Sequence, residues 1–183
     1  MKLAHGLIML TLFLSAGANA VIVSSGNITQ EDILKAQNSW GDGLLGLSSV
    51  GKSDQSTLNK MAESFVDSVY GYTDGVVLFK PTLAKDEHTF RLSKDAAISY
   101  FIGGNEKYTQ DKGFAIKEKW VSFKHENAAI QMNGQYAYAM GKLHLVNKQG
   151  VKTIVDKTWG FKKMDDGSTR VILHHSSLPY DGK

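Results

Sequence analysis

The sequence predicts an α+β fold in which helices come first and a strongly curved, mixed or antiparallel sheet of about six strands follows. Three observations lead to this prediction. Apolar residues recur three and four apart from Asn27 to Val50 and again from Ser53 to Gly71, as on one face of a helix. Four long segments of strand character occupy the chain after Ala115. Between them stand turn dipeptides such as Asn133-Gly134, which favour tight hairpins.

The two long helices are predicted from their first residues and their apolar stripes. Thr29 stands three residues before Asp32, which is typical of a capping box. We expect this first helix to be loosened at Gly41 and Gly43, because glycine weakens a helix interior. The second helix starts near Asp54. Its stripe consists of Leu58, Met61, Ala62, Phe65, Val66 and Val69.

Two short strands and a third helix are predicted before the long strands. Residues 75–80 form an apolar run that Pro81 stops, and residues 89–92 can return as a second strand. Ser93 caps a short helix that reaches Tyr100 and is closed by two glycines. The four long antiparallel strands span residues 115–132, 135–147, 151–164 and 169–178.

The strand at residues 135–147 has two faces, and neither is polar enough for free exposure to water. One row is Tyr136, Tyr138, Met140, Lys142, His144 and Val146, and the other is Ala137, Ala139, Gly141, Leu143 and Leu145. A sheet with one solvated face would alternate cleanly. Three helices can cover one face, so we expect the second face to pair with another subunit in a homodimer. The alternative is a monomer with a few exposed aromatic residues.

The N-terminus is typical of a secretory signal peptide. Lys2 precedes an apolar run from Leu7 to Leu14, and small residues end at Ala20, after which we expect cleavage. The apolar run is far shorter than the roughly 20 residues that cross a bilayer, so no membrane insertion is expected. Residues 21–183 then form a single domain, which we expect to be exported to a bacterial periplasm.

The composition argues against several classes of site. The 183 residues include no cysteine, which excludes disulfides and thiolate metal sites. The formal net charge of +3 is dispersed, so no nucleic-acid partner is expected. The adjacent pairs His125-Glu126 and His174-His175 point to opposite faces of a strand and cannot chelate one ion. We therefore expect neither a metal nor a cofactor.

Four segments carry a resemblance to a known superfamily. They are residues 75–81 (GVVLFKP), 90–104 (FRLSKDAAISYFIGG), 124–128 (KHENA) and 171–179 (VILHHSSLP). In this order they resemble the NTF2-like, SnoaL-like superfamily. The last segment is similar to the closing strand of the calcium/calmodulin-dependent kinase II association domain. The resemblance spans residues 28–179 and implies a cone-shaped pocket, made by a sheet wrapped around a helix.

The resemblance implies two classes of function, because this scaffold hosts both enzymes and assembly modules. The first is a protein that binds a small organic ligand in the cone, with cofactor-independent acid–base catalysis of the cyclase, isomerase or dehydratase type. The alternative is a non-catalytic dimerisation module that resembles the kinase association domain. The sequence leaves open whether the protein is an enzyme.

The predicted catalytic residues come from the last strand and its neighbour. Adjacent histidines must point to opposite faces, and strict alternation groups His175 with Val171. The resemblance places His175 in the pocket and His174 at the subunit contact. A histidine there can act as a general acid or base, and Asp156 is the carboxylate best placed to work with it. The alternatives are a hydrogen-bonded core histidine and a surface salt bridge.

The predicted ligand-binding residues include Lys142, His144 and Tyr138, which share one row. If this row faces the cone, it suits a carboxylate-bearing or enolic ligand, and if it faces the partner, these are interface residues. The remaining candidates line the pocket wall or rim, each with packing as the alternative: Trp159, Tyr100, Trp40 and Arg91.

Overall fold

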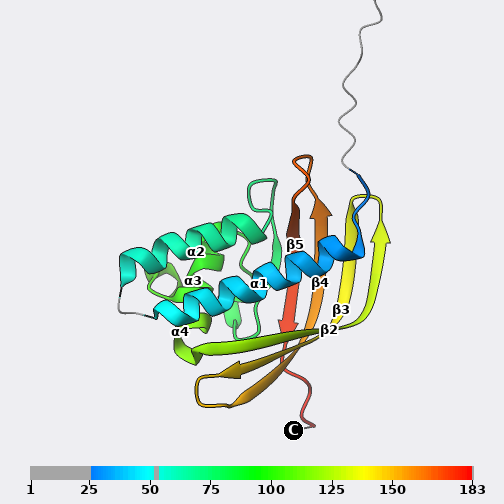
Figure 1. Cartoon of the computed structure of the whole chain (residues 1–183). Helices are drawn as coiled ribbons and strands as arrows, with labels where there is room; N and C mark the ends of the chain where they lie inside the picture. The colour runs from blue at the N-terminus through cyan, green and yellow to red at the C-terminus, as the bar shows by residue number, and fades with distance from the viewer. Residues whose placement is uncertain (1–25, 52–53, 183) are drawn as a thin grey trace, which may run out of the picture.

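A computed structural model describes residues 26–51 and 54–182, and helices precede the long strands as predicted (Figure 1). The predicted signal peptide, residues 1–20, lies outside the described residues and stays a prediction. The helices are α1 (Gln30–Val50), α2 (Gln55–Val69), α3 (Lys94–Ile102) and α4 (Phe114–Glu118), with 3₁₀ turns η1 (Asp86–His88) and η2 (Glu106–Tyr108). The strands are β1 (Leu78–Lys80), β2 (Trp120–Asn133), β3 (Tyr136–Asn147), β4 (Lys152–Lys163) and β5 (Thr169–Ser177).

The five strands form one sheet in the order β1-β5-β4-β3-β2. Strand β1 is parallel to β5 and all other neighbours are antiparallel, so the predicted α+β class and mixed sheet are confirmed. The predicted sixth strand at residues 89–92 is wrong. Arg91 N–H donates a hydrogen bond to the carbonyl of Phe79 at 2.8 Å, and this contact with a three-residue strand does not grow into a ladder.

Helix α1 crosses the inner face of the curved sheet and packs against β2 and β5 (Figure 1). It runs unbroken for 21 residues, so the predicted loosening at its glycines is wrong. A Cβ added at Gly41 would lie 2.3 Å from the ring of Phe123, and one at Gly43 would lie 2.2 Å from the ring of Phe65. The two glycines therefore admit aromatic rings from β2 and α2 against the helix backbone.

Irregular register bends the sheet around α1. Strand β2 shifts register against β3 between Trp120 and Ser122 and again between Asn127 and Ala129. Strands β4 and β5 shift where Phe161 pairs with Val171 but Gly160 pairs with Leu173, which leaves Ile172 without a register partner. Such bulges bend a strand and re-aim its side chains. The shift at Ile172 decides which residues of β5 enter the core.

The two rows of β3 have different surroundings. Ala137, Ala139, Leu143 and Leu145 are buried in the core beneath the helices, whereas Tyr138 is 47% exposed and Met140 is 61% exposed on the outer face. The row with the tyrosines and Lys142 therefore faces away from the helices. Within the described ranges, no helix is both long enough and apolar enough to cross a membrane.

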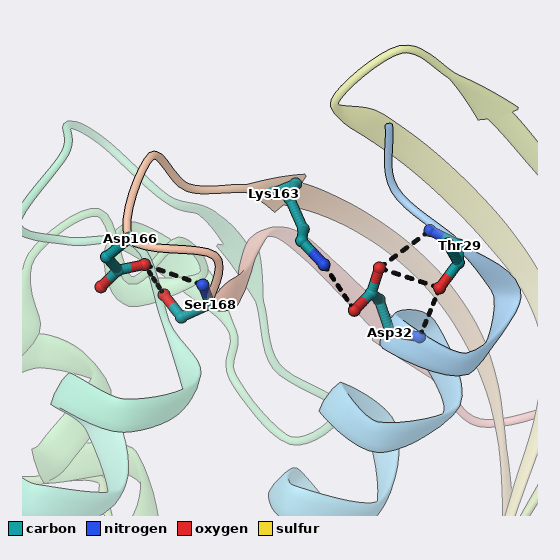
Figure 2. Close-up of polar contacts among 5 residues, drawn as sticks. All are labelled: Thr29, Asp32, Lys163, Asp166 and Ser168. Carbon is teal, nitrogen blue, oxygen red and sulfur yellow. Dashed lines mark hydrogen bonds and ion pairs between the residues drawn. The ribbon is translucent and has the colours of Figure 1, made fainter. Parts of the chain in front are cut away.

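The start of α1 is tied to the end of β4 through Asp32 (Figure 2). Its carboxylate accepts the Thr29 backbone N–H at 2.9 Å, and the Thr29 hydroxyl accepts the Asp32 N–H at 3.2 Å, which confirms the capping box. The other carboxylate oxygen lies 2.6 Å from Lys163 Nζ. Burial opposes the charged form, but the bonds from Lys163 and Thr29 lower the pKa of Asp32.

We expect Asp32→Ala to destabilise the protein by about 1 kcal/mol at pH 7, because it removes one cap and one ion pair. A carboxyl group with a lowered pKa stabilises the fold above its unfolded pKa, and this contribution is lost as the pH falls. The difference in the free energy of unfolding between the variant and wild type should therefore shrink below about pH 4. Urea unfolding at pH 7 and below about pH 4 measures this difference. Asp166→Ala, in the neighbouring turn, removes a second carboxyl whose pKa is lowered, by bonds from Ser168, so its difference from wild type should narrow in the same direction (Figure 2). A difference for Asp32→Ala that stays constant across pH would contradict this account.

Candidate active site

Two polar residues of β5 point into the core. His174 is the register partner of Trp159, and Ser176 is the register partner of Lys157. All four side chains are buried. A histidine, a serine and a lysine thus meet on the inner face of the sheet, where the surrounding side chains are mostly apolar.

The bulge at Ile172 corrects the predicted orientation of the histidine pair. Strict alternation grouped His175 with Val171 and the resemblance placed His175 in the pocket, but the unpaired residue shifts the alternation by one position. His174 is therefore 2% exposed in the core, and His175 lies exposed on the outer face. The prediction that adjacent histidines diverge is confirmed, and the assignment of His175 to the pocket and His174 to the subunit contact is wrong.

A path of hydrogen bonds crosses the core from α1 to β4. Trp40 Nε1–H donates to the hydroxyl of Tyr70 at 2.8 Å. That hydroxyl lies 2.8 Å from His174 Nδ1, and His174 Nε2 is in hydrogen-bond contact with Lys157 Nζ. We call these four residues the buried path. Both nitrogens of the His174 ring are occupied by it.

Aromatic rings hold the buried path in place. The centroid of the His174 ring lies 4.3 Å from that of Trp159 and 4.5 Å from that of Phe79, and both contacts are stacked. Lys157 Nζ lies 4.5 Å from the centroid of the Trp40 ring and 4.7 Å from that of Trp159. Each aromatic pair adds about 0.5–1.5 kcal/mol beyond the area that it buries. The imidazole is therefore fixed by stacking as well as by hydrogen bonds.

Burial shifts the titration of these groups away from their ordinary ranges. It lowers the pKa of Lys157 and that of His174 well below their usual values, and it raises the pKa of the Tyr70 hydroxyl. It also lowers the pKa of His125, which flanks the path from β2, to about 4. The His125 Nε2 atom lies 2.9 Å from the carbonyl oxygen of Gln37. The core thus favours the neutral form of each of these groups.

Three hydroxyl groups lie beside the buried path, and we call them the hydroxyl cluster: Thr82, Tyr100 and Ser176. Thr82 Oγ1 and Ser176 Oγ are 2.6 Å apart. The Tyr100 hydroxyl is buried and makes no hydrogen bond of good geometry, although Thr82 and the Leu83 backbone lie near enough to affect its pKa, which burial raises. The Phe79 ring lies 5.8 Å from the Tyr100 ring and 4.5 Å from the His174 ring, so it contacts both, and Ser176, the register partner of Lys157, joins the cluster to the path.

An ion pair supports the cluster from the side of α3. Arg91 is fully buried, and its Nη2 lies 2.6 Å from an oxygen of Asp111. The other Asp111 oxygen accepts the Ser99 hydroxyl at 2.7 Å, next to Tyr100 in α3. Arg91 Nε and Nη1 are buried, and neither has a hydrogen-bond partner among the residues that the structure describes. The guanidinium therefore keeps donor capacity for a further acceptor.

The other predicted residues of β3 and β4 lie outside this site. Lys142 Nζ contacts an Asp156 oxygen at 2.7 Å, and His144 Nε2 contacts a Glu126 oxygen at 2.9 Å, both on the outer face of the sheet. Tyr138 shares that face. Asp156 thus has the surface salt bridge that was its alternative. Of the two sides left open for the row of Lys142, His144 and Tyr138, the structure shows the outer one, because the small and aliphatic row of β3 occupies the inner face.

The predicted wall and rim residues are all interior. Trp40 and Trp159 are each 1% exposed, and their rings meet edge to face at 5.6 Å, so they fill the cone instead of lining its mouth. Tyr100 and Arg91 are likewise buried, and the rim position predicted for them is wrong. A cavity of about 1000 Å³ lies elsewhere, and its lining includes Leu45, Ser48, Ile116, Lys117 and Trp120.

The sequence analysis missed most of the residues that meet here: Tyr70, Thr82, Lys157, His174 and Ser176. One of them left a signal, because Lys157 shares a row with Val155, Trp159 and Phe161, and a lysine in an apolar row requires a reason. In the part of the chain that the structure describes, no group of three or more metal-ligating side chains is placed to hold an ion.

Comparison with known proteins identifies the family. The family model described as metal-independent carbonic anhydrase matches residues 31–178. A metal-independent carbonic anhydrase of Nostoc sp. (strain PCC 7120) is 43% identical over 155 residues, which cover 84% of this chain and 75% of the relative. The chain belongs to the metal-independent carbonic anhydrase family.

Solved structures agree with this family assignment and with the fold. An iota-carbonic anhydrase from a cyanobacterium, solved with bicarbonate, has a TM-score of 0.82 and 42% identity, covering 88% of this chain and 98% of that one. A Xanthomonas campestris protein described as a calcium/calmodulin-dependent protein kinase II association domain has a TM-score of 0.54 at 18% identity, covering 85% and 91%. At that identity it shows the fold alone. NTF2-like and cystatin-like proteins also match, so the predicted NTF2-like fold is confirmed.

Membership in the metal-independent carbonic anhydrase family overturns the predicted functions. The sequence analysis expected a small organic ligand for an enzyme of the cyclase, isomerase or dehydratase type, or a non-catalytic dimerisation module. Both are contradicted by a family model that covers residues 31–178 and by the identity to a curated carbonic anhydrase. The prediction failed because it inferred the reaction from the fold, and one fold hosts many chemistries, so its shape does not identify the substrate.

We expect His174→Ala to lower the free energy of unfolding by about 3 kcal/mol or more, because it removes a stacked ring and leaves Tyr70 and Lys157 without their partner. His175→Ala should change it by less than about 0.5 kcal/mol, as is usual for exposed residues. Urea unfolding of both variants measures the contrast. Equal effects, or a larger effect at His175, would show that the register of β5 is wrong.

Proposed function

We propose that this protein catalyses the interconversion of CO2 and bicarbonate without a metal. The family assignment supports the reaction, and the similar cyanobacterial enzyme was solved with bicarbonate. The observation that carries the proposal for this chain is the buried hydroxyl cluster, in which the Tyr100 hydroxyl makes no hydrogen bond of good geometry. A ligand oxygen within reach would give this buried hydroxyl a hydrogen bond of better geometry than Thr82 and the Leu83 backbone offer it.

The hydroxyl cluster suits the oxygens of CO2 and bicarbonate. Thr82 and Ser176 share one hydrogen bond, so one of their two protons and the Tyr100 proton can go to a water and to the oxygens of the substrate, and each hydroxyl oxygen can also accept. When water attacks the carbon of CO2, negative charge develops on the CO2 oxygens. Donors that are already oriented in a buried site stabilise this charge more than bulk water does. Phe79 supplies an apolar surface beside the cluster for CO2, which has no net charge.

The positive charge of Arg91 suits the anionic product. Its two unpartnered nitrogens are buried, and its charge lowers the pKa of Tyr100, against the effect of burial. Asp111 holds both the guanidinium and Ser99, the residue before Tyr100, at 2.6 and 2.7 Å. We assign this ion pair the role of fixing the start of the cluster in α3 and of favouring an anion nearby.

The chemistry requires a protein base. A metal ion activates water by lowering its pKa, and a metal-independent enzyme must instead remove the proton with a side chain during or after attack. Ser176 and His174 stand two residues apart on the inner face of β5, so the hydroxyl cluster and the buried path adjoin. The neutral bases of the path, Lys157 and His174, are therefore the groups that we assign to take that proton.

We expect Tyr100→Phe and Ser176→Ala each to reduce kcat/KM for CO2 hydration about ten- to hundredfold, because each removes one donor to the developing charge. Stopped-flow hydration assays with a pH indicator measure the rates, before and after dialysis against a chelator. Tyr138→Phe removes the same hydroxyl from the outer face and is the matched control. Full activity in both inner variants, or loss of wild-type activity with the chelator, would contradict the proposal.

We also propose that the outer face of the sheet pairs with a second copy of the protein. Tyr136, Tyr138, Met140 and Ile154 are 40–61% exposed there, and two ion pairs flank them. Apolar side chains gathered on one sheet face are typical of subunit interfaces.

We expect Met140→Glu to convert a dimer into a monomer, because it would bury a carboxylate in an apolar contact. Light scattering during gel filtration measures the mass. Val76→Glu, at a site that is 64% exposed before β1, should leave the mass unchanged. A monomeric wild-type protein would rule out the dimer.

A further inference from the structure

We propose that Lys157, together with His174, stores the proton that is released when CO2 is hydrated at the hydroxyl cluster. This inference rests on the proposed function and assigns a residue to one step of it. Four features of the structure support it: the hydrogen-bond pattern of the buried path, the absence of an acidic partner, the aromatic surroundings of the amine, and the position of Lys157 opposite Ser176.

The hydrogen-bond pattern is complete when the Lys157 amine is neutral. Trp40 can only donate to the Tyr70 oxygen, and the phenol proton is then free to go to His174 Nδ1. His174 in this tautomer carries its proton on Nε2 and donates it to the lone pair of Lys157 Nζ. A charged ammonium has no lone pair, so it would reverse the imidazole tautomer and leave the phenol proton without an acceptor in the path.

In the part of the chain that the structure describes, Lys157 has no acidic partner. The titratable groups that face it are His174 from β5 and His125 from β2, α1 contributes Trp40, and Tyr70 at the end of α2 lies on the far side of His174. Within residues 26–51 and 54–182, no carboxylate forms an ion pair with Lys157. An ammonium that is 5% exposed and lacks an anion is costly, which again favours the amine at rest.

The same surroundings accept a proton when an anion forms nearby. The faces of Trp40 and Trp159 lie 4.5 and 4.7 Å from Nζ, and indole rings attract an ammonium in that position. Ser176 is the register partner of Lys157, and paired residues on one face of a sheet have Cβ atoms only about 5 Å apart. Bicarbonate at the hydroxyl cluster and a cation at Lys157 would therefore form an attractive pair in a buried site.

The hydration step balances in atoms and charge. The oxygen of a water molecule bonds to the carbon of CO2, one carbon–oxygen π pair moves to oxygen, and one water proton leaves. That proton comes to rest between Lys157 Nζ and His174 Nε2, which are already in hydrogen-bond contact. Neutral reactants thus give one anion and one cation side by side. Departure of bicarbonate leaves the cation without its partner, so the proton passes to buffer and the amine is restored.

The first experiment replaces the amine without removing its bulk. Lys157→Met keeps an unbranched apolar side chain against the rings of Trp40 and Trp159. The matched control is Lys142→Met, which changes the same residue type on the outer face. We expect Lys157→Met to lose at least tenfold in kcat with little change in KM, and to regain activity when a small amine or imidazole is added. Its activity should also lose the decline toward acid pH that protonation of the resting amine gives the wild type.

The outcomes separate the two proposals. Wild-type activity in Lys157→Met without added base, with the same pH profile, would overturn proton storage and leave the carbonic anhydrase proposal intact. An inactive wild-type protein would overturn both. Thermal unfolding checks that the methionine variant is folded, and Lys157→Arg, which keeps a permanent charge, should be as impaired as Lys157→Met if a neutral base is needed.

The second experiment reads the charge of Lys157 without an activity assay. Lysine labelled with ¹³C and ¹⁵N in the full protein gives an Nζ signal that is assigned by its loss in Lys157→Met. We expect a neutral amine at pH 7 and an ammonium after saturation with bicarbonate. A signal that is charged before bicarbonate is added, or that stays neutral after bicarbonate binding is detected by calorimetry, would overturn the inference.

Discussion

The candidate site depends on one irregularity of the sheet, the unpaired residue Ile172 in β5. Upstream of it Val171 points into the core, and downstream of it His174 and Ser176 do so in place of their neighbours. A regular strand would expose His174 to solvent and put His175 inside, and the path from Trp40 to Lys157 would lose its central member. The bulge interrupts the hydrogen-bond ladder at one position, and in return it turns the side chains of His174 and Ser176 toward the aromatic rings of the core.

The interior holds polar groups in surroundings of low dielectric constant, and among the described residues no carboxylate pairs with the Lys157 amine. In such surroundings an unpaired charge is far more costly than a satisfied neutral hydrogen bond. Tyr70, His174 and Lys157 satisfy one another in their neutral forms, and burial keeps them neutral. A reaction that creates an anion next to such a network changes its energetics at once, because the anion makes a neighbouring cation favourable. In the proposed mechanism, this coupling takes the place of the fixed positive charge that a metal ion supplies.

The two faces of the sheet carry different kinds of polar residue. The inner face carries the buried path and the hydroxyl cluster, supported by the ion pair of Arg91 and Asp111. The outer face carries Tyr138, Met140 and the solvent-accessible pairs formed by Lys142 and His144. Two residues of the same type, Lys142 and Lys157, thus have opposite surroundings: the first is in contact with solvent and the second is buried. Exposed pairs of the outer kind contribute little to stability, whereas the inner lysine has its protonation set by the fold.

The sequence by itself determined the periodic features of this protein. It predicted both long helices, the capping box at Thr29, the four long strands and the α+β class, because helix and strand spacing and hairpin glycines act locally. The start of the first long strand was wrong: it was predicted at residue 115, but residues 114–118 form helix α4 and β2 begins at Trp120. It also showed that the two histidines diverge. The tertiary structure decided which of them is inside, since a one-residue bulge reverses every side chain beyond it and has no local signature. It also decided that Trp40 and Trp159 fill the cone and that Lys157 contacts His174, because these contacts join residues from different helices and strands. The buried environment that sets the protonation of Lys157 and His174 exists only once the sheet has curved around α1.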